Sequence, residues 1–183
     1  MNEMADFLNS LPKPERKKRK PITPVTSYRH DYNARYDAAR RVMFEREYPQ
    51  SFAAGGYYSK KVVINTTNGF QNYIQDVLIN LGHKCERVNT MGIPVRNKQT
   101  GQIKWQHSGS TKGSSDLHAV LKIPSQRFGV PWKIEVKSGK DELRKAQEKY
   151  RDNVIEVGSL YTLIYVGDTD LFWDEYDKYI KLL

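Results

Sequence analysis

The stretch that most constrains this chain runs from Lys112 to Lys137, because it places charged side chains at the ends of two apolar segments. Its first part, KGSSDLHAVL, predicts a loop of small residues that turns directly into a strand at Asp116. Its last part, WKIEVKSG, predicts a second strand. Successive side chains of a strand point to opposite faces, so Glu135 and Lys137 lie on one face. If the two strands pair, Asp116 and Glu135 meet at one edge.

Two carboxylates and a backbone carbonyl form an oxygen site suited to Mg²⁺ or Mn²⁺. A hard cation of this kind polarises a phosphoryl oxygen and lowers the pKa of a bound water, while a nearby lysine offsets developing charge. The expected chemistry is therefore phosphodiester hydrolysis. The triplet Glu-Val-Lys alone does not establish it, because alternating polar residues on a half-exposed strand produce such pairs by chance.

The order Gly-x-x-Asp-Leu, then Glu-Val-Lys, then a helix that carries Gln147 resembles the PD-(D/E)XK nuclease superfamily. Within it, the chain is most similar to the virus-type replication-repair nuclease (VRR-NUC) family and to phage nucleases that resemble Holliday-junction resolvases. The similarity covers residues 68–166. It implies an α/β fold with a restriction-endonuclease-like core of helix, mixed β-sheet, helix and strand. It also implies a Mg²⁺- or Mn²⁺-dependent endonuclease that cleaves DNA in phage or viral replication, repair or recombination.

The resemblance also implies roles for individual residues. Those expected at the site are the metal ligands Asp116 and Glu135, the carbonyl donor Val136, the catalytic Lys137 and the helix residue Gln147. Two positions depart from the family pattern. Ser115 stands where proline often precedes the aspartate, and Gln71 stands where many members carry a glutamate on the first helix. A third acidic ligand is therefore not provided by Gln71.

Three polar residues keep alternative interpretations. Gln71 follows Asn68 by three residues, so it is either a site residue or a capping-box partner of that residue. His118 shares a strand face with Asp116, so it either supports the site, acts as a base, or is a half-buried strand histidine without chemistry. Gln147 is a polar residue on an otherwise apolar helix face, and either the strand of Glu135 or a backbone carbonyl would satisfy its amide.

The net charge of +9 indicates an anionic partner, and residues 61–167 carry +7 of it. Ribosome-associated and membrane-surface proteins share this property, so charge alone identifies only a polyanion. A basic run flanked by prolines and the lysine before the Asp116 loop are predicted to contact DNA phosphates: Arg16, Lys17, Lys18, Arg19, Lys20 and Lys112. The alternatives for the basic run are a nuclear-localisation signal or a solubilising tail.

Cysteine content and hydropathy indicate the cellular compartment in which the protein is expected. The single cysteine, Cys85, excludes an internal disulfide framework and a thiolate zinc cluster within one chain. No apolar run reaches the length of a bilayer span, and the first residues lack the apolar segment of a signal peptide. We expect a cytoplasmic protein without a membrane partner, located in the host cytoplasm if it is viral.

The chain divides into a basic arm at residues 1–27, an accessory helix and linker at 28–60, and a nuclease-like domain at 61–183. Periodicity and capping residues predict helices over 28–48, 68–82, 141–157 and 171–183, and strands over 61–65, 85–88, 93–96, 103–105 and 160–166. The tyrosine and arginine stripe of the first helix either docks it on the core or clamps a single strand. The last helix is expected to pack on the core or to form a homodimer contact. The alternative function is an inactive nucleic-acid-binding or virion structural protein that keeps the nuclease fold.

Overall fold

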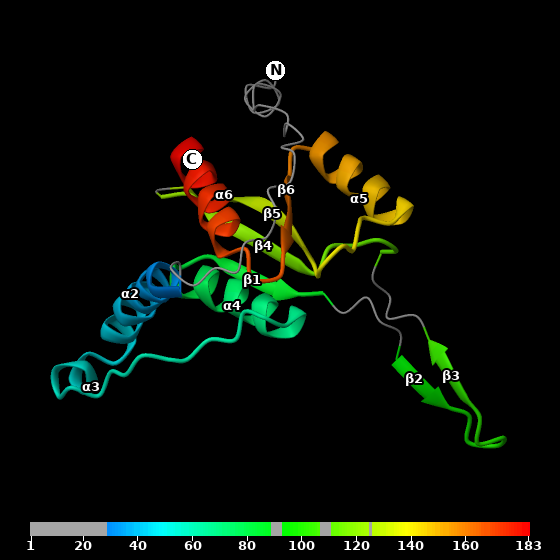
Figure 1. Cartoon of the computed structure of the whole chain (residues 1–183), viewed down its shortest axis with the longest axis horizontal. Coiled ribbons are helices and arrows are strands. Elements are labelled where there is room, and N and C mark those ends of the chain that lie inside the picture. The colour runs from blue at the N-terminus through cyan, green and yellow to red at the C-terminus, as the bar shows by residue number, and fades with distance from the viewer. Residues whose placement is uncertain (1–28, 89–92, 107–110, 125) are drawn as a thin grey trace.

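A computed structural model of the chain describes residues 29–88, 93–106, 111–124 and 126–183. The fold is mixed α/β, with a four-stranded mixed sheet, a separate two-stranded hairpin and five helices in the described ranges (Figure 1). In chain order the elements are α2 (Arg29–Glu47), α3 (Pro49–Ala53), α4 (Thr67–Asn80), β1 (Lys84–Arg87), β2 (Ile93–Arg96), β3 (Ile103–Gln106), β4 (Leu117–Lys122), β5 (Gly129–Lys137), α5 (Lys145–Glu156), β6 (Leu160–Tyr165) and α6 (Thr169–Leu182).

The main sheet has the strand order β1-β4-β5-β6. β4 is antiparallel to both of its neighbours, whereas β5 and β6 are parallel because α5 connects them. The apolar run of β6 is typical of a central strand, but β6 lies at the edge of the sheet. Both α5 and α6 contact β6, so its apolar side chains are covered without a second neighbouring strand.

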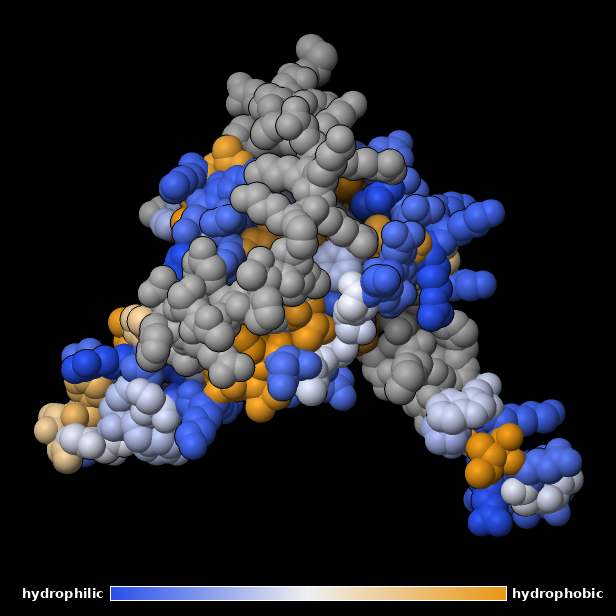
Figure 2. Space-filling view, viewed as in Figure 1, coloured by the Kyte–Doolittle hydropathy of each residue, from blue (hydrophilic) through white to orange (hydrophobic). Residues whose placement is uncertain are grey.

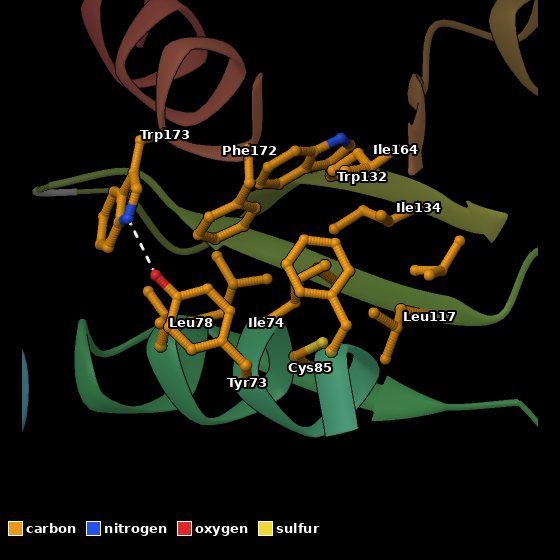
Figure 3. Packing of buried hydrophobic residues seen from close by; sticks show 14 of the residues in the cluster. Tyr73, Ile74, Leu78, Cys85, Leu117, Trp132, Ile134, Ile164, Phe172 and Trp173 are labelled. Carbon is orange, nitrogen blue, oxygen red and sulfur yellow. Dashed lines mark hydrogen bonds between the residues drawn. The ribbon is translucent and has the colours of Figure 1, made fainter. Parts of the chain in front are cut away.

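The core lies between one face of the sheet and the helices α4 and α6. Trp132 stacks on Phe172 with ring centroids 5.9 Å apart, and the Trp173 indole donates a hydrogen bond of 3.0 Å to the Tyr73 hydroxyl (Figure 3). Stacked and edge-to-face aromatic contacts of this kind add to the burial of apolar area. Of the two alternatives given for the last helix, the structure shows packing on the core, since Phe172 and Trp173 of α6 are buried.

The accessory helix α2 docks on the same core. Its Tyr36 is fully buried and lies 5.5 Å from the Tyr73 ring, and Ala39 is buried beside it. These two contacts confirm the docking interpretation for this part of the stripe. Pro49 does not simply end the helical region, because it occupies the first turn of the short helix α3, a position where proline is tolerated.

The ends of two helices differ from expectation. α4 begins at Thr67 because the Thr66 side chain accepts a hydrogen bond from the Gly69 amide, so Asn68 is not the cap. α5 begins at Lys145 rather than at Asp141. The reason is that the Gln147 side chain accepts a 3.0 Å hydrogen bond from the Arg144 amide and closes the first turn there.

Two strand predictions also change. Residues 61–65 form no strand, because Val62 and Ile64 satisfy the apolar alternation by packing against the core without a backbone partner strand. β2 and β3 pair with each other as an antiparallel hairpin, but β1 does not join them. It pairs with β4 instead, so the hairpin is inserted between two neighbouring strands of the main sheet.

Candidate functional site

The pairing of β4 with β5 brings Asp116 and Glu135 together. Leu117 lies opposite Ile134 in the antiparallel register, so the preceding Asp116 continues opposite Glu135. The Val136 amide donates a 2.9 Å hydrogen bond to the Asp116 carboxylate, which holds that side chain against β5. Two acids from different parts of the chain therefore face each other at one end of the sheet.

Lys137 and Gln147 complete a closed network around Glu135. The Lys137 ammonium lies 3.1 Å from Glu135 Oε1 and donates a 3.0 Å hydrogen bond to Gln147 Oε1. The Gln147 amide nitrogen in turn donates to Glu135 Oε1. Glu135 and Lys137 are only 2% and 5% exposed. The α5 helix thus fixes the charged ends of both side chains through a single amide.

The Glu135 carboxylate uses only one of its two oxygens. Oε2 is buried and accepts no hydrogen bond from any residue in the described ranges. Burial, followed by the charge of Asp116, raises the pKa of Glu135 to about 7, against the opposing effect of Lys137. Burial also raises the pKa of Asp116, although the Val136 amide opposes that rise. Both acids are therefore disfavoured in their ionised forms when no further cation is present.

These residues fit a hard divalent cation. Glu135 Oε2 and the Asp116 carboxylate supply anionic oxygens. The Lys137 carbonyl accepts from the Val166 amide across β6, so the neighbouring Val136 carbonyl points to the opposite side, where Asp116 lies. No group of three or more histidine, cysteine, aspartate or glutamate side chains that could hold a metal occurs within the described ranges. A cation here would draw its remaining ligands from water.

Gln71 lies buried on α4 beside Asp116, where its side chain makes a hydrogen bond that lowers the pKa of that acid. Its Oε1 accepts a 2.6 Å hydrogen bond from Arg87. The capping-box interpretation of Gln71 is wrong, because the α4 cap is Thr66. Arg87 was not predicted at the site, although it also reaches two asparagines of α4, and its charge lowers the pKa of Asp116. Only the pairing of β1 with β4 reveals it.

His118 lies two residues beyond Asp116 on the same face. Its Nε2 is 3.1 Å from both the Ser114 and the Tyr150 hydroxyl oxygens, and its ring stacks on Tyr150. Burial, followed by the charge of Lys133, lowers the pKa of His118 to about 4. The imidazole is therefore neutral at pH 7, and its contacts tie the loop before β4 to α5.

The same loop approaches α5 through Gly113. This glycine has a φ of +85°, and a Cβ atom there would lie 2.3 Å from the Ala146 carbonyl oxygen. Only glycine permits both the backbone conformation and the close approach. The neighbouring Lys112 is exposed on this loop, next to the site. The predicted DNA contacts from Arg16 to Lys20 lie outside the described residues.

Tyr161 is a second residue that sequence reasoning missed. It lies opposite Lys133 in the parallel pair of β5 and β6, and therefore on the same face as Glu135. Burial raises the pKa of Tyr161, and so do the charges of Glu135 and Asp116. Its hydroxyl is buried without a hydrogen-bond partner in the part of the chain that the structure describes. The alternation along β6 could have found it, but only with the register known.

None of the helices among the described residues combines the length and the apolar composition needed to span a bilayer. No family model, curated protein or solved structure matches the chain. Any assignment of function therefore depends on the side chains and the geometry described above.

Proposed function

We propose that the chain is a Mg²⁺- or Mn²⁺-dependent nuclease that hydrolyses DNA phosphodiester bonds, of the kind used in phage or viral replication, repair and recombination. The observation that carries this proposal is the arrangement of Asp116, Glu135 and Lys137. The half-buried Asp116 faces the buried Glu135, Lys137 contacts Glu135, and Glu135 Oε2 has no hydrogen-bond partner among the described residues.

The order of the elements supports the proposal. α4, β1, β4, β5, α5 and β6 follow one another as helix, strands, helix and strand, which is the order implied by the resemblance to PD-(D/E)XK nucleases. Asp116 precedes β4, Glu135 and Lys137 close β5, and Gln147 begins α5. The four motif residues therefore lie at the ends of their elements, close to one another.

The side chains have separate roles in this proposal. Asp116, Glu135 and the Val136 carbonyl would hold the cation, which when bound supplies Lewis acidity and activates a water. Lys137, fixed by Gln147, orients that water and offsets the negative charge that develops on the phosphoryl group. Glu135 must be ionised for this role, so cleavage should rise with pH through about 7.

A second candidate is a nucleic-acid-binding or virion protein that keeps the fold without cleaving DNA. The observation that favours it is Gln71, an amide held by Arg87 where the family often supplies an acid. This candidate shares the basic surface but predicts no metal site.

A cleavage assay separates the two candidates. The parent and Asp116→Asn are incubated with branched, flapped, single-stranded and linear duplex DNA, with Mn²⁺ or with chelator. The nuclease proposal predicts metal-dependent products from the parent on at least one substrate and none from Asp116→Asn. DNA binding without cleavage of any substrate in Mn²⁺ would support the second candidate.

A further inference from the structure

The β2–β3 hairpin projects away from the main sheet and its helices (Figure 1). In its register Pro94 lies opposite Trp105, and Arg96 lies opposite Ile103. Residues that lie opposite each other share a face, and alternate residues along a strand do so as well. Pro94, Arg96, Ile103 and Trp105 therefore form one face of the hairpin.

Three of the four residues of this face are apolar, and the face is exposed. Trp105 is 70% exposed and Ile103 is 64% exposed, whereas the other two tryptophans of the chain are buried. Figure 2 shows apolar atoms of the hairpin beside hydrophilic ones at the lower right of the molecule. A two-stranded hairpin has no second layer against which to bury such side chains, and large exposed apolar groups on one face indicate a partner.

The charge of the hairpin identifies the class of partner. Residues 93–106 contain three cations, Arg96, Lys98 and Lys104, and no acidic residue. A second copy of the hairpin would bring like charges together, which disfavours self-association through this face. An aromatic side chain among cations suits unpaired nucleic acid, since bases stack on the ring while phosphates meet the charges. In a duplex the base faces are already stacked on one another.

We propose that the hairpin binds single-stranded DNA, with an unpaired base stacked on Trp105 between Pro94 and Ile103, and with Arg96 and Lys98 contacting the phosphates. The hairpin is inserted between β1 and the loop that carries Lys112. Each four-residue connector, 89–92 or 107–110, spans at most about 18 Å. Because the Val88 amide donates a hydrogen bond to the Asp116 carbonyl, a strand held by the hairpin is tethered about one connector length from Asp116. This extension to the substrate rests on the proposed function, and it favours DNA that joins a single-stranded segment to a duplex.

Tryptophan fluorescence in the presence of chelator tests the binding without any requirement for cleavage. Titration of the full chain with an oligothymidylate should quench the emission of Trp105, the only exposed tryptophan. Trp105→Ala should remove the quenching and weaken binding, measured by anisotropy of a labelled oligonucleotide, about tenfold or more, as expected for one lost base stack. Tyr58→Ala is the matched control, because Tyr58 is 75% exposed and lies outside the hairpin. It should bind like the parent.

The cations give a second measurement. Lys98→Gln should reduce the slope of log affinity against log salt by about 0.7, the value for one phosphate contact on a single strand. Lys181→Gln, an exposed lysine of α6, should leave that slope unchanged. Binding of the oligonucleotide with no change in Trp105 emission would overturn the proposal, as would equal affinity of Trp105→Ala and the parent. A parent that binds but never cleaves would refute only the proposed nuclease activity.

Discussion

The two faces of β5 bury very different side chains. Trp132 and Ile134 point into the aromatic core between the sheet and the helices α4 and α6, where the Trp132 indole donates a hydrogen bond to Thr162 (Figure 3). Glu135 and Lys137, which alternate with them, point to the face that α5 covers, and none of the α5 residues is fully buried. One strand therefore contributes both to the aromatic core and to the region that holds the buried charges of Glu135 and Lys137.

The core face therefore stabilises the fold, whereas the site face buries charge at a cost in stability. Burying apolar rings is favourable, whereas burying charges is costly unless they are paired. The raised pKa values of Asp116 and Glu135 express that cost. Substitutions on the core face should thus reduce stability, and substitutions on the site face should reduce chemistry while leaving the fold intact.

The largest effect is expected on the core face. Trp132 is fully buried, stacks on Phe172 and donates a 2.9 Å hydrogen bond to Thr162. Trp132→Ala should lower the free energy of unfolding by about 3–5 kcal/mol, as measured by urea unfolding. Phe128→Ala, an exposed aromatic just before the same strand, should change it by less than about 0.5 kcal/mol. Equal losses in the two variants would contradict the described core.

On the site face, Lys137→Ala should lower the turnover of DNA cleavage by about 10²-fold or more, because one positioned electrostatic group is lost. Metal affinity, measured by calorimetry, should hardly change, since Lys137 is not a ligand. Lys133→Ala is the matched control on the same strand and face, and it should cleave like the parent. Parent-like cleavage by Lys137→Ala would show that the motif is wrongly assigned.

A smaller effect is expected on the pH dependence of the free energy of unfolding, measured in the presence of chelator. The folded-state pKa of Glu135 is raised to about 7 from an ordinary value of 4.5. The stability that protonated Glu135 contributes is therefore fully present below pH 4.5 and is lost as the pH rises through 7. Glu135→Gln imitates the protonated form. It should therefore raise the free energy of unfolding at pH 8 by on the order of 1–3 kcal/mol and have little effect at pH 4. A variant less stable than the parent at pH 8 would contradict this account of the buried acid.

The smallest effect is expected for Gln147, which positions Lys137 and Glu135 and would not touch the cation. Gln147→Ala should lower turnover about tenfold, the cost of one hydrogen bond to a charged group. Glu148→Ala, an exposed neighbour in the same helical turn, should retain parent turnover. A loss for Gln147→Ala as large as that for Lys137→Ala would assign the amide a direct role in the reaction.

Local patterns predicted the elements around the site well. The alternation in WKIEVK and the small residues that precede Asp116 predicted that the acids lie at strand ends. Both are short-range properties of the chain. The edge position of β6 and the absence of a strand at residues 61–65 could not be predicted, because apolar alternation records burial and not the presence of a pairing partner.

The parts of the site that the sequence did not predict all depend on register. Arg87 lies near Asp116 because β1 pairs with β4, and Tyr161 lies near Glu135 because β6 runs parallel to β5. Neither residue belongs to a local motif. Asp141 was expected to cap a helix, but it lies 3.4 Å from the Lys137 ammonium instead, since the chain does not turn helical until Lys145.

Thermal melting with and without Mn²⁺ shows whether Asp116 and Glu135 form a cation site. A cation that binds only the folded chain at 100 times its Kd adds about 2.7 kcal/mol of stability, or about 5–10 °C in Tm for a chain of this size. We expect such a rise for the parent at pH 8 and a smaller one at pH 6, where protons compete for Glu135. Asp116→Asn should lose the rise, and the exposed control Asp174→Asn should keep it. A parent Tm that does not respond to Mn²⁺ at pH 8 would contradict the account.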